Sequence, residues 1–71
     1  MKDEKQTLEE FVKRKRKSVK MTQKEMAEKA GVGLRFVREL ERGKETLKMD
    51  KINQVLELFG YNLGPQKMYR E

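Results

Sequence analysis

Three arginines, Arg35, Arg38 and Arg42, follow two closely spaced glycines, Gly31 and Gly33, and are separated by intervals of three and four residues. On an α-helix, residues at these intervals lie within about 60° of one another and share one face. The planar guanidinium group of arginine can donate two parallel hydrogen bonds to O6 and N7 of guanine. The spacing therefore predicts a cationic helix face that recognises a polyanion, with nucleic acid as the first candidate.

The distribution of charge along the chain favours the same partner. The 71-residue chain has a net charge of +6, whereas residues 11–44 alone carry twelve basic and four acidic residues and so a net charge of +8. An anionic membrane surface or a plain solvated helix face would suit the same charge. The basic helices carry an apolar face that can form a core, not the aromatic-rich face of an interfacial helix, which argues against the membrane.

The residues that the sequence lacks exclude several classes of function. There is no cysteine and no histidine, so we expect no disulfide, no metal and no cofactor. No phosphate-binding glycine loop and no acid–base constellation is present, and so short a chain leaves little room for a substrate pocket; we do not expect an enzyme. No apolar run approaches the roughly 20 residues that span a bilayer, and there is no signal peptide, which predicts a cytoplasmic protein.

The apolar residues follow a helical period in four segments. These segments cover about residues 8–19, 22–30, 34–42 and 50–59. Val19 is expected on the inner face of the first segment. Thr22 and Glu25 form a capping box at the start of the second, and Asp50 is the expected N-cap of the fourth. Glycines end the last three segments.

The second and third segments are joined by only about three residues. A connection this short between helices that cross at roughly 90–120° is a helix-turn-helix. Packing of Val37 and Leu40 against the neighbouring helices would turn the arginines outward. Arg16 and Glu41 each interrupt an apolar stripe, on two different helices, which is costly unless the two charges pair.

The stretch "MTQKEMAEKAGVGLRFVRELERGK" resembles the DNA-binding core of the Cro/cI-type (XRE) helix-turn-helix family. The resemblance covers about residues 8–60. "GLRFVRELERGK" followed by "TLKMDKINQVLELFGYNLG" is similar to the HipB-type antitoxins, including the Y4mF-like group. These resemblances imply an all-α, lambda-repressor-like bundle of four to five helices. They also imply that "YNLGP" forms a short C-terminal strand, which pairs with its two-fold mate at a homodimer interface.

The candidate site residues follow from the helix pattern together with the resemblance. The candidates for reading DNA bases are Arg35, Arg38, Leu34, Gly33 and Glu39. Leu34 could equally cover the edge of the core, and Glu39 could simply pair with a neighbouring arginine. The candidates for holding DNA phosphates are Thr22, Gln23, Lys24, Arg42 and Lys44. The resemblance places Arg16 and Glu41 in an internal ion pair, and the expected dimer interface comprises Leu58, Tyr61 and Leu63.

These assignments divide the chain into a frayed or disordered N-terminus (1–6), a DNA-binding domain (7–60) and a dimerisation strand with a tail (61–71). The resemblance implies a transcriptional repressor that binds a palindromic operator in double-stranded DNA, located in the bacterial cytoplasm at the nucleoid. As a HipB-type antitoxin it would autoregulate a toxin–antitoxin operon and bind a HipA-type kinase toxin. The alternatives are a stand-alone XRE regulator and an RNA-binding module. The lack of an aromatic stacking platform argues against single-stranded RNA.

Overall fold

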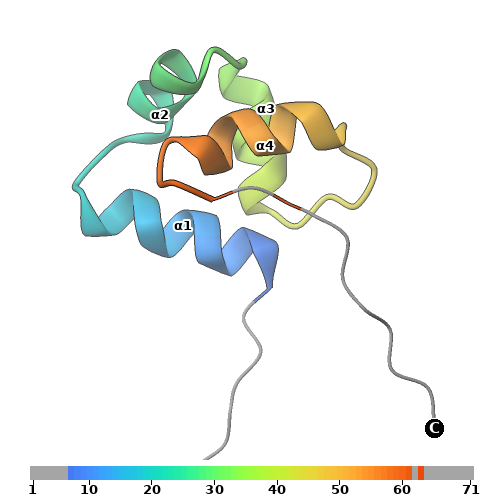
Figure 1. Ribbon diagram of the computed structural model, residues 1–71, viewed down its shortest axis with the longest axis horizontal. Coiled ribbons are helices and arrows are strands. Elements are labelled where there is room, and N and C mark those ends of the chain that lie inside the picture. The colour runs from blue at the N-terminus through green and yellow to red at the C-terminus, as the bar shows by residue number, and fades with distance from the viewer. Residues whose placement is uncertain (1–6, 62, 64–71) are drawn as a thin grey trace, which may run out of the picture.

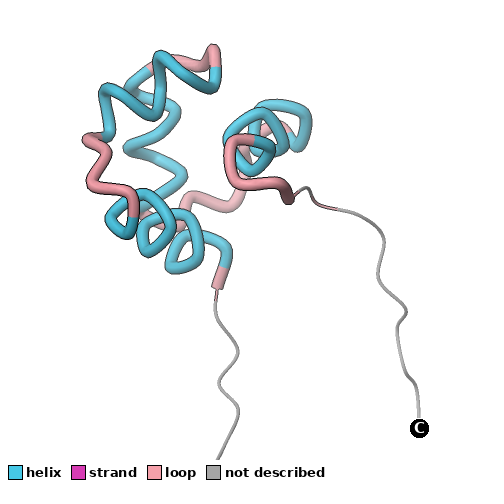
Figure 2. Tube along the Cα trace, turned by 60° about the vertical axis from the view of Figure 1, so that its left-hand side comes forward, coloured by secondary structure: helices cyan, strands magenta, loops and turns pink. Residues whose placement is uncertain are grey.

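Four helices form a bundle in the computed structural model, which describes residues 7–61 and 63 (Figure 1). The helices are α1 (Leu8–Ser18), α2 (Gln23–Ala30), α3 (Leu34–Glu41) and α4 (Met49–Glu57). α3 packs against α1 and α2, and α4 packs against α2. The described part of the chain contains helices and loops only (Figure 2). The expectation of an all-α helix-turn-helix bundle is therefore confirmed.

Every helix contributes its apolar stripe to a single core. The buried apolar residues are Val12, Met26, Ala27, Val37, Leu40, Ile52, Val55 and Leu56. Phe36 and Leu34 are half-buried and pack against the edge of this core. Ala27 lies on α2, and its small side chain allows α3 to approach closely at the turn. The core thus fixes which face of α3 remains outside.

Two of the helices begin with the same side-chain cap. The hydroxyls of Thr7 and Thr22 accept from the backbone N–H groups of Glu10 and Glu25, at 3.2 and 3.0 Å. Each glutamate carboxylate accepts in return from the N–H of its threonine, at 3.2 and 2.8 Å. The capping box at Thr22 is confirmed. The equivalent box at Thr7 has the same sequence pattern, although the sequence analysis did not identify it.

All four helices end in the same hydrogen bond, in which a backbone N–H donates to the carbonyl five residues earlier. The donors are Met21, Val32, Lys44 and Tyr61. This closure requires a residue with positive φ just before the donor. Glycine fills that position after α2, α3 and α4, but Lys20 fills it after α1, with φ of 58°. For a residue with a Cβ this conformation costs roughly 1–2 kcal/mol.

Two expectations about helix ends were wrong. Val19 lies just beyond α1 and its side chain is 53% exposed, because the chain turns at Lys20 before another inward position is reached. Lys48, not Asp50, is the N-cap of α4, since helical geometry already begins at Met49. Asp50 lies in the first turn instead, where a carboxylate interacts favourably with the helix dipole.

The segment after α4 returns to α1 through an aromatic contact. The rings of Tyr61 and Phe11 meet edge to face with centroids 4.9 Å apart, and the Lys15 ammonium lies over both rings. The Leu63 N–H donates to the Asn53 side chain at 2.6 Å. Neither Tyr61 nor Leu63 lies in a strand. Residues 62, 64 and 65 of the expected strand, and the expected frayed terminus at 1–6, lie outside the described residues.

No helix among the described residues is both long enough and apolar enough to cross a membrane.

Candidate nucleic-acid interface

The outer face of α3 is exposed because the opposite face forms part of the core. Val37 and Leu40 are buried, whereas Arg35 and Arg38 face solvent, and the Arg35 side chain is 90% exposed. Arg42 directly follows the helix and is exposed as well. The structure thus places all three arginines on the solvent side of α3.

Glu39 lies between two of the cations on this face. Its Oε2 atom is 3.4 Å from Nε of Arg35, and its Oε1 atom is 3.5 Å from Nζ of Lys44. These distances are those of loose, solvent-screened ion pairs, which contribute little to stability. The contacts orient Arg35 and Lys44 on the outer face without burying either charge.

The N-terminal end of α3 combines an open glycine with a half-buried leucine. Gly33 is the N-cap of α3, and a Cβ placed there would have no atom within 4 Å. A ligand could therefore approach the backbone at Gly33 closely. Leu34 packs against the core, so the structure favours the edge-of-core role for it. Gly33 and Leu34 lie beside Arg35 in the sequence, but neither has a polar side chain that could donate to a ligand.

Arg16 and Glu41, the two charges on apolar stripes, meet in a bidentate ion pair. Nε and Nη2 of Arg16 donate to the two carboxylate oxygens at 2.7 and 2.9 Å, and Nη1 of Arg16 donates to the Met21 carbonyl at 2.9 Å. The Gln23 side-chain amide donates to the same carboxylate at 3.0 Å. The Glu41 side chain is only 2% exposed. This network ties α1, α2 and α3 together.

The ionisation of Glu41 is controlled by opposing effects. Burial disfavours its charge, but hydrogen bonds from Arg16 and Gln23, together with the positive charges of Arg16 and Lys13, outweigh this and lower the pKa of Glu41 below its ordinary value. The hydrogen bond to Glu41 correspondingly raises the pKa of Arg16. The pair is therefore fully charged at neutral pH.

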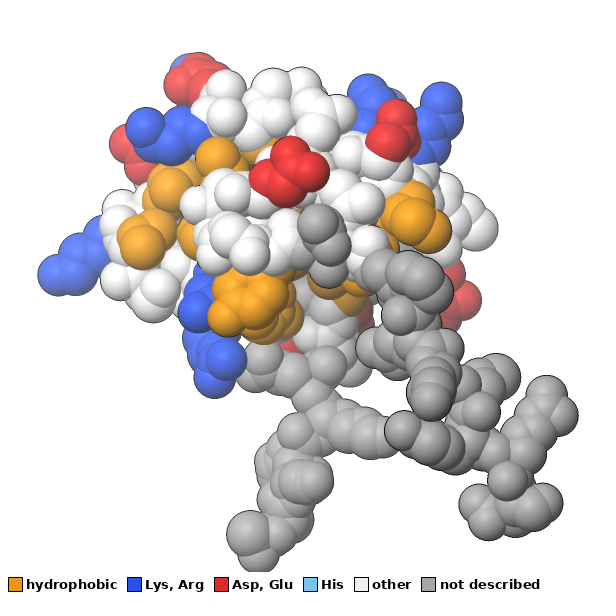
Figure 3. Space-filling view, in the orientation of Figure 1, with side chains coloured by type: hydrophobic (Ala, Val, Ile, Leu, Met, Phe, Trp, Pro, Cys, Tyr) orange, Lys and Arg blue, Asp and Glu red, His pale blue; other side chains and the backbone are white. Residues whose placement is uncertain are grey.

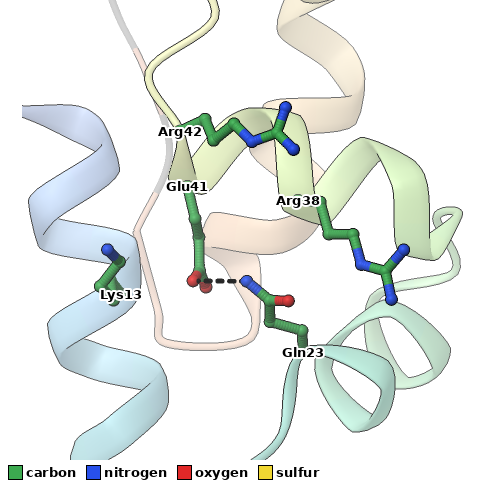
Figure 4. A pocket seen from close by; sticks show the side chains of 5 residues that line it. All are labelled: Lys13, Gln23, Arg38, Glu41 and Arg42. Carbon is green, nitrogen blue, oxygen red and sulfur yellow. Dashed lines mark hydrogen bonds between the residues drawn. The ribbon is translucent and has the colours of Figure 1, made fainter.

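A hollow of about 270 Å³ opens above this ion pair, between α1, α2 and α3. We call it the cationic hollow. It is lined by Lys13, Gln23, Arg38, Glu41 and Arg42 (Figure 4). These residues come from three helices and from the residue following α3, yet they surround one space. The cationic hollow and the outer face of α3 share Arg38 and Arg42, so the two form one continuous surface.

The start of α2 borders the same surface through Gln23. The Thr22 hydroxyl is engaged in the cap of α2, and Lys24 is exposed in the first turn. The amides of a helix N-terminus favour an anion. Gln23 and Lys44 contact α3 through Glu41 and Glu39, whereas no such contact joins Thr22 or Lys24 to α3 among the described residues.

The opposite side of the molecule has a different charge pattern. On the face where α4 lies in front, lysine and arginine side chains are scattered around the margins and do not gather at the centre (Figure 3). The cations that line the hollow come from α1, α3 and the residue after α3, and α4 contributes none of them.

Comparison with known proteins identifies this arrangement of helices. The helix-turn-helix family model matches residues 12–65. The chain belongs to the XRE-type helix-turn-helix family. The HTH-type transcriptional regulator y4mF of Sinorhizobium fredii (strain NBRC 101917 / NGR234) is 46% identical over 48 residues, which cover 68% of this chain and 63% of that relative. The resemblance to the XRE family and its Y4mF-like group is thereby confirmed, and the match spans less than two thirds of the relative.

Within this XRE-type domain, the basic run at residues 13–17 was expected to be mostly a solvated face of the first helix, with one or two side chains reaching phosphate, and Lys13 was not singled out. Lys13 precedes Arg16 by three residues on α1, and this spacing places both on one side of the helix. The ion pair of Arg16 with Glu41 therefore also determines where Lys13 stands. The signal was present in the sequence, but it depended on knowing which way α1 faces.

Proposed function

We propose that this chain is a sequence-specific regulator of transcription that binds double-stranded DNA through α3. The observation that carries the proposal is the solvent face of α3, where exposed arginines directly follow a helix-turn-helix corner beside the cationic hollow. The printed name of the y4mF relative, a transcriptional regulator, supports the same role.

In the proposed complex α3 enters the major groove. Arg35 donates to a guanine edge, and Glu39 either holds Arg35 in position or accepts from a cytosine amino group. Gly33 allows close approach of the backbone, and Leu34 covers the core edge beside a thymine methyl. Arg38 lies at the boundary between the groove-facing side of α3 and the cationic hollow.

Phosphate contacts would supply the affinity that does not depend on sequence. We assign these contacts to Thr22, Gln23, Lys24, Arg42 and Lys44. Gln23 and Lys44 contact residues of α3 and Arg42 directly follows it, so phosphate contacts from these residues would fix the register in which α3 meets the bases.

We further propose that the regulator is a homodimeric repressor with a palindromic operator. Tyr61 is 48% exposed although its ring contacts Phe11, and Leu58 packs on the edge of the core. With Leu63, these residues offer an apolar surface to a second copy. The two copies of α3 would lie about 34–36 Å apart, or a multiple of this distance.

The finer biological role rests on the sequence resemblance to HipB-type antitoxins. In that role the protein would repress its own toxin–antitoxin operon at the nucleoid in the cytoplasm and bind a HipA-type kinase toxin. A stand-alone regulator is the alternative, and the identity of the neighbouring gene distinguishes the two.

Selection from a randomised duplex library tests the DNA-binding proposal directly. We expect the wild-type chain to enrich a palindrome and to shift that duplex in a gel in preference to an RNA duplex of the same sequence. Deletion of residues 61–71 should give a monomer with weakened operator binding. Equal retention of DNA and RNA, or no enriched sequence, would contradict the proposal.

A further inference from the structure

The cationic hollow brings together three positively charged side chains, those of Lys13, Arg38 and Arg42. Among the residues that the structure describes, no hydrogen bond or ion pair engages the side chains of Lys13, Arg38 or Arg42. The carboxylate in the lining, Glu41, is already balanced by Arg16. The lining therefore carries three positive charges and one carboxylate, which already forms an ion pair with Arg16.

This arrangement separates the arginines of α3 into two groups. Arg35 pairs with Glu39 and does not line the hollow. Arg38 and Arg42 line it together with Lys13, which reaches the same space from α1. An anion in the hollow would be attracted by all three cations.

We propose that the cationic hollow holds one backbone phosphate of the bound DNA, with Lys13, Arg38 and Arg42 as its ligands. Arg38 is then a phosphate ligand and not a base reader. The inference rests on the proposed function, because the phosphate is part of the duplex that α3 reads.

The size and chemistry of the hollow suit this occupant. Its volume of about 270 Å³ equals that of about nine water molecules, enough for a phosphate group that keeps part of its hydration. Arginine can hold phosphate oxygens with two parallel N–H bonds, and lysine supplies a compact point charge. Lys13 stands on α1 and Arg38 on α3, so a phosphate held between them would fix how α3 is oriented in the groove.

Salt-dependent binding to a duplex selected by the wild-type chain tests this assignment. The variants are Lys13→Gln and Arg38→Gln. Lys51→Gln is a matched control because Lys51 is exposed on α4, which contributes nothing to the hollow. Arg35→Gln is the comparison for base reading. The affinity of each is measured at several salt concentrations, on the selected duplex and on duplexes with single base-pair changes.

We expect Lys13→Gln and Arg38→Gln each to lose about tenfold in affinity on every duplex alike. Each should also reduce the magnitude of the slope of log K against log salt by about 0.9, and Lys51→Gln should change neither quantity. Replacing the contacted phosphate by an uncharged methylphosphonate should remove the effect of both variants.

Two results would overturn the assignment while leaving the proposed function intact. The first is that the wild-type chain and the Lys13→Gln variant bind the selected duplex with equal affinity. The second is an Arg38→Gln variant that loses preference at one base pair only, which would make Arg38 a base reader. A wild-type chain that selects no duplex would overturn the proposed function and the phosphate site together.

Discussion

Glu39 and Glu41 stand two residues apart on α3 and have opposite surroundings. Glu41 faces inward, is 2% exposed, and receives three hydrogen bonds from Arg16 and Gln23. Glu39 faces outward between Arg35 and Lys44, at distances of 3.4 and 3.5 Å. The same residue type therefore belongs to the buried ion-pair network on one side of α3 and to a solvated surface on the other. Charge alone does not predict stability; burial and hydrogen bonding decide it.

The largest expected effect comes from removing the inner carboxylate. Glu41→Ala leaves Arg16, 12% exposed, without its partner, which should lower the free energy of unfolding by the order of 3–5 kcal/mol. Glu39→Ala is the matched control and should cost less than about 1 kcal/mol. Urea melts of both variants measure the difference. Similar midpoints for the two variants would show that Glu41 contributes no more to stability than Glu39 does.

A paired substitution sharpens the same contrast. Replacing both partners by apolar residues, as in Arg16→Met with Glu41→Leu, leaves no buried charge unpaired. We expect this double variant to be more stable than either single variant, because the cost lies in the orphaned charge and not in the missing attraction. If the effects of the two single substitutions simply add, the residues are not energetically coupled.

The inner carboxylate should also dominate the acid side of the stability profile. Its pKa is lower in the folded chain than the ordinary value of 4.5, which applies when the chain is unfolded. The stabilisation is therefore complete well above pH 4.5 and is lost as the pH falls through the lower, folded pKa. The wild-type chain should lose stability over that range more steeply than Glu41→Gln. If stability falls equally with decreasing pH in the wild-type chain and in Glu41→Gln, Glu41 does not control the loss of stability in acid.

The outer face should matter for DNA recognition and little for folding. Arg35→Ala should remove about 1–3 kcal/mol of discrimination at one base pair while leaving the melting midpoint nearly unchanged. Binding to a panel of single-base operator variants, with a melt of the same preparation, measures both quantities. A uniform loss across the panel would mean that Arg35 contacts phosphate.

The smallest expected effect is that of Glu39→Gln. This change removes a negative charge between Arg35 and Lys44 but retains a polar side chain, and we expect less than about 0.5 kcal/mol of change in stability. Binding to non-cognate duplex should strengthen slightly, because a charge that repels phosphate is lost. Weaker binding to every duplex would instead indicate that Glu39 positions the two cations.

Much of the fold could be predicted from local patterns. The capping box at Thr22, the glycine stop at Gly31 and the apolar period of α3 each depend on residues close in sequence, and the structure contains all three features. The N-cap of α4 was misassigned because Asp50 is a good cap by residue type. The loop before it reaches helical geometry two residues earlier than the sequence suggests, since the N-cap is Lys48.

The site was harder to predict because it depends on how the helices face one another. Arg16 and Glu41 stood out as charges on apolar stripes, and this pattern can be recognised in the sequence alone. The cationic hollow cannot be recognised in the sequence, because Lys13 is separated from Arg38 by the whole of α2. Its position follows from tertiary packing that no local period contains.

Lys20 has a consequence for local motion. Its positive φ strains the turn after α1, where the Met21 N–H donates to the Arg16 carbonyl at 3.1 Å. The Arg16 side chain holds the same turn in place through the Met21 carbonyl. The amide proton of Met21 is thus protected from exchange with solvent by its hydrogen bond to the Arg16 carbonyl, in a turn that the Arg16 guanidinium also holds. Its exchange rate would report, from the surface, whether the ion pair inside the bundle is intact.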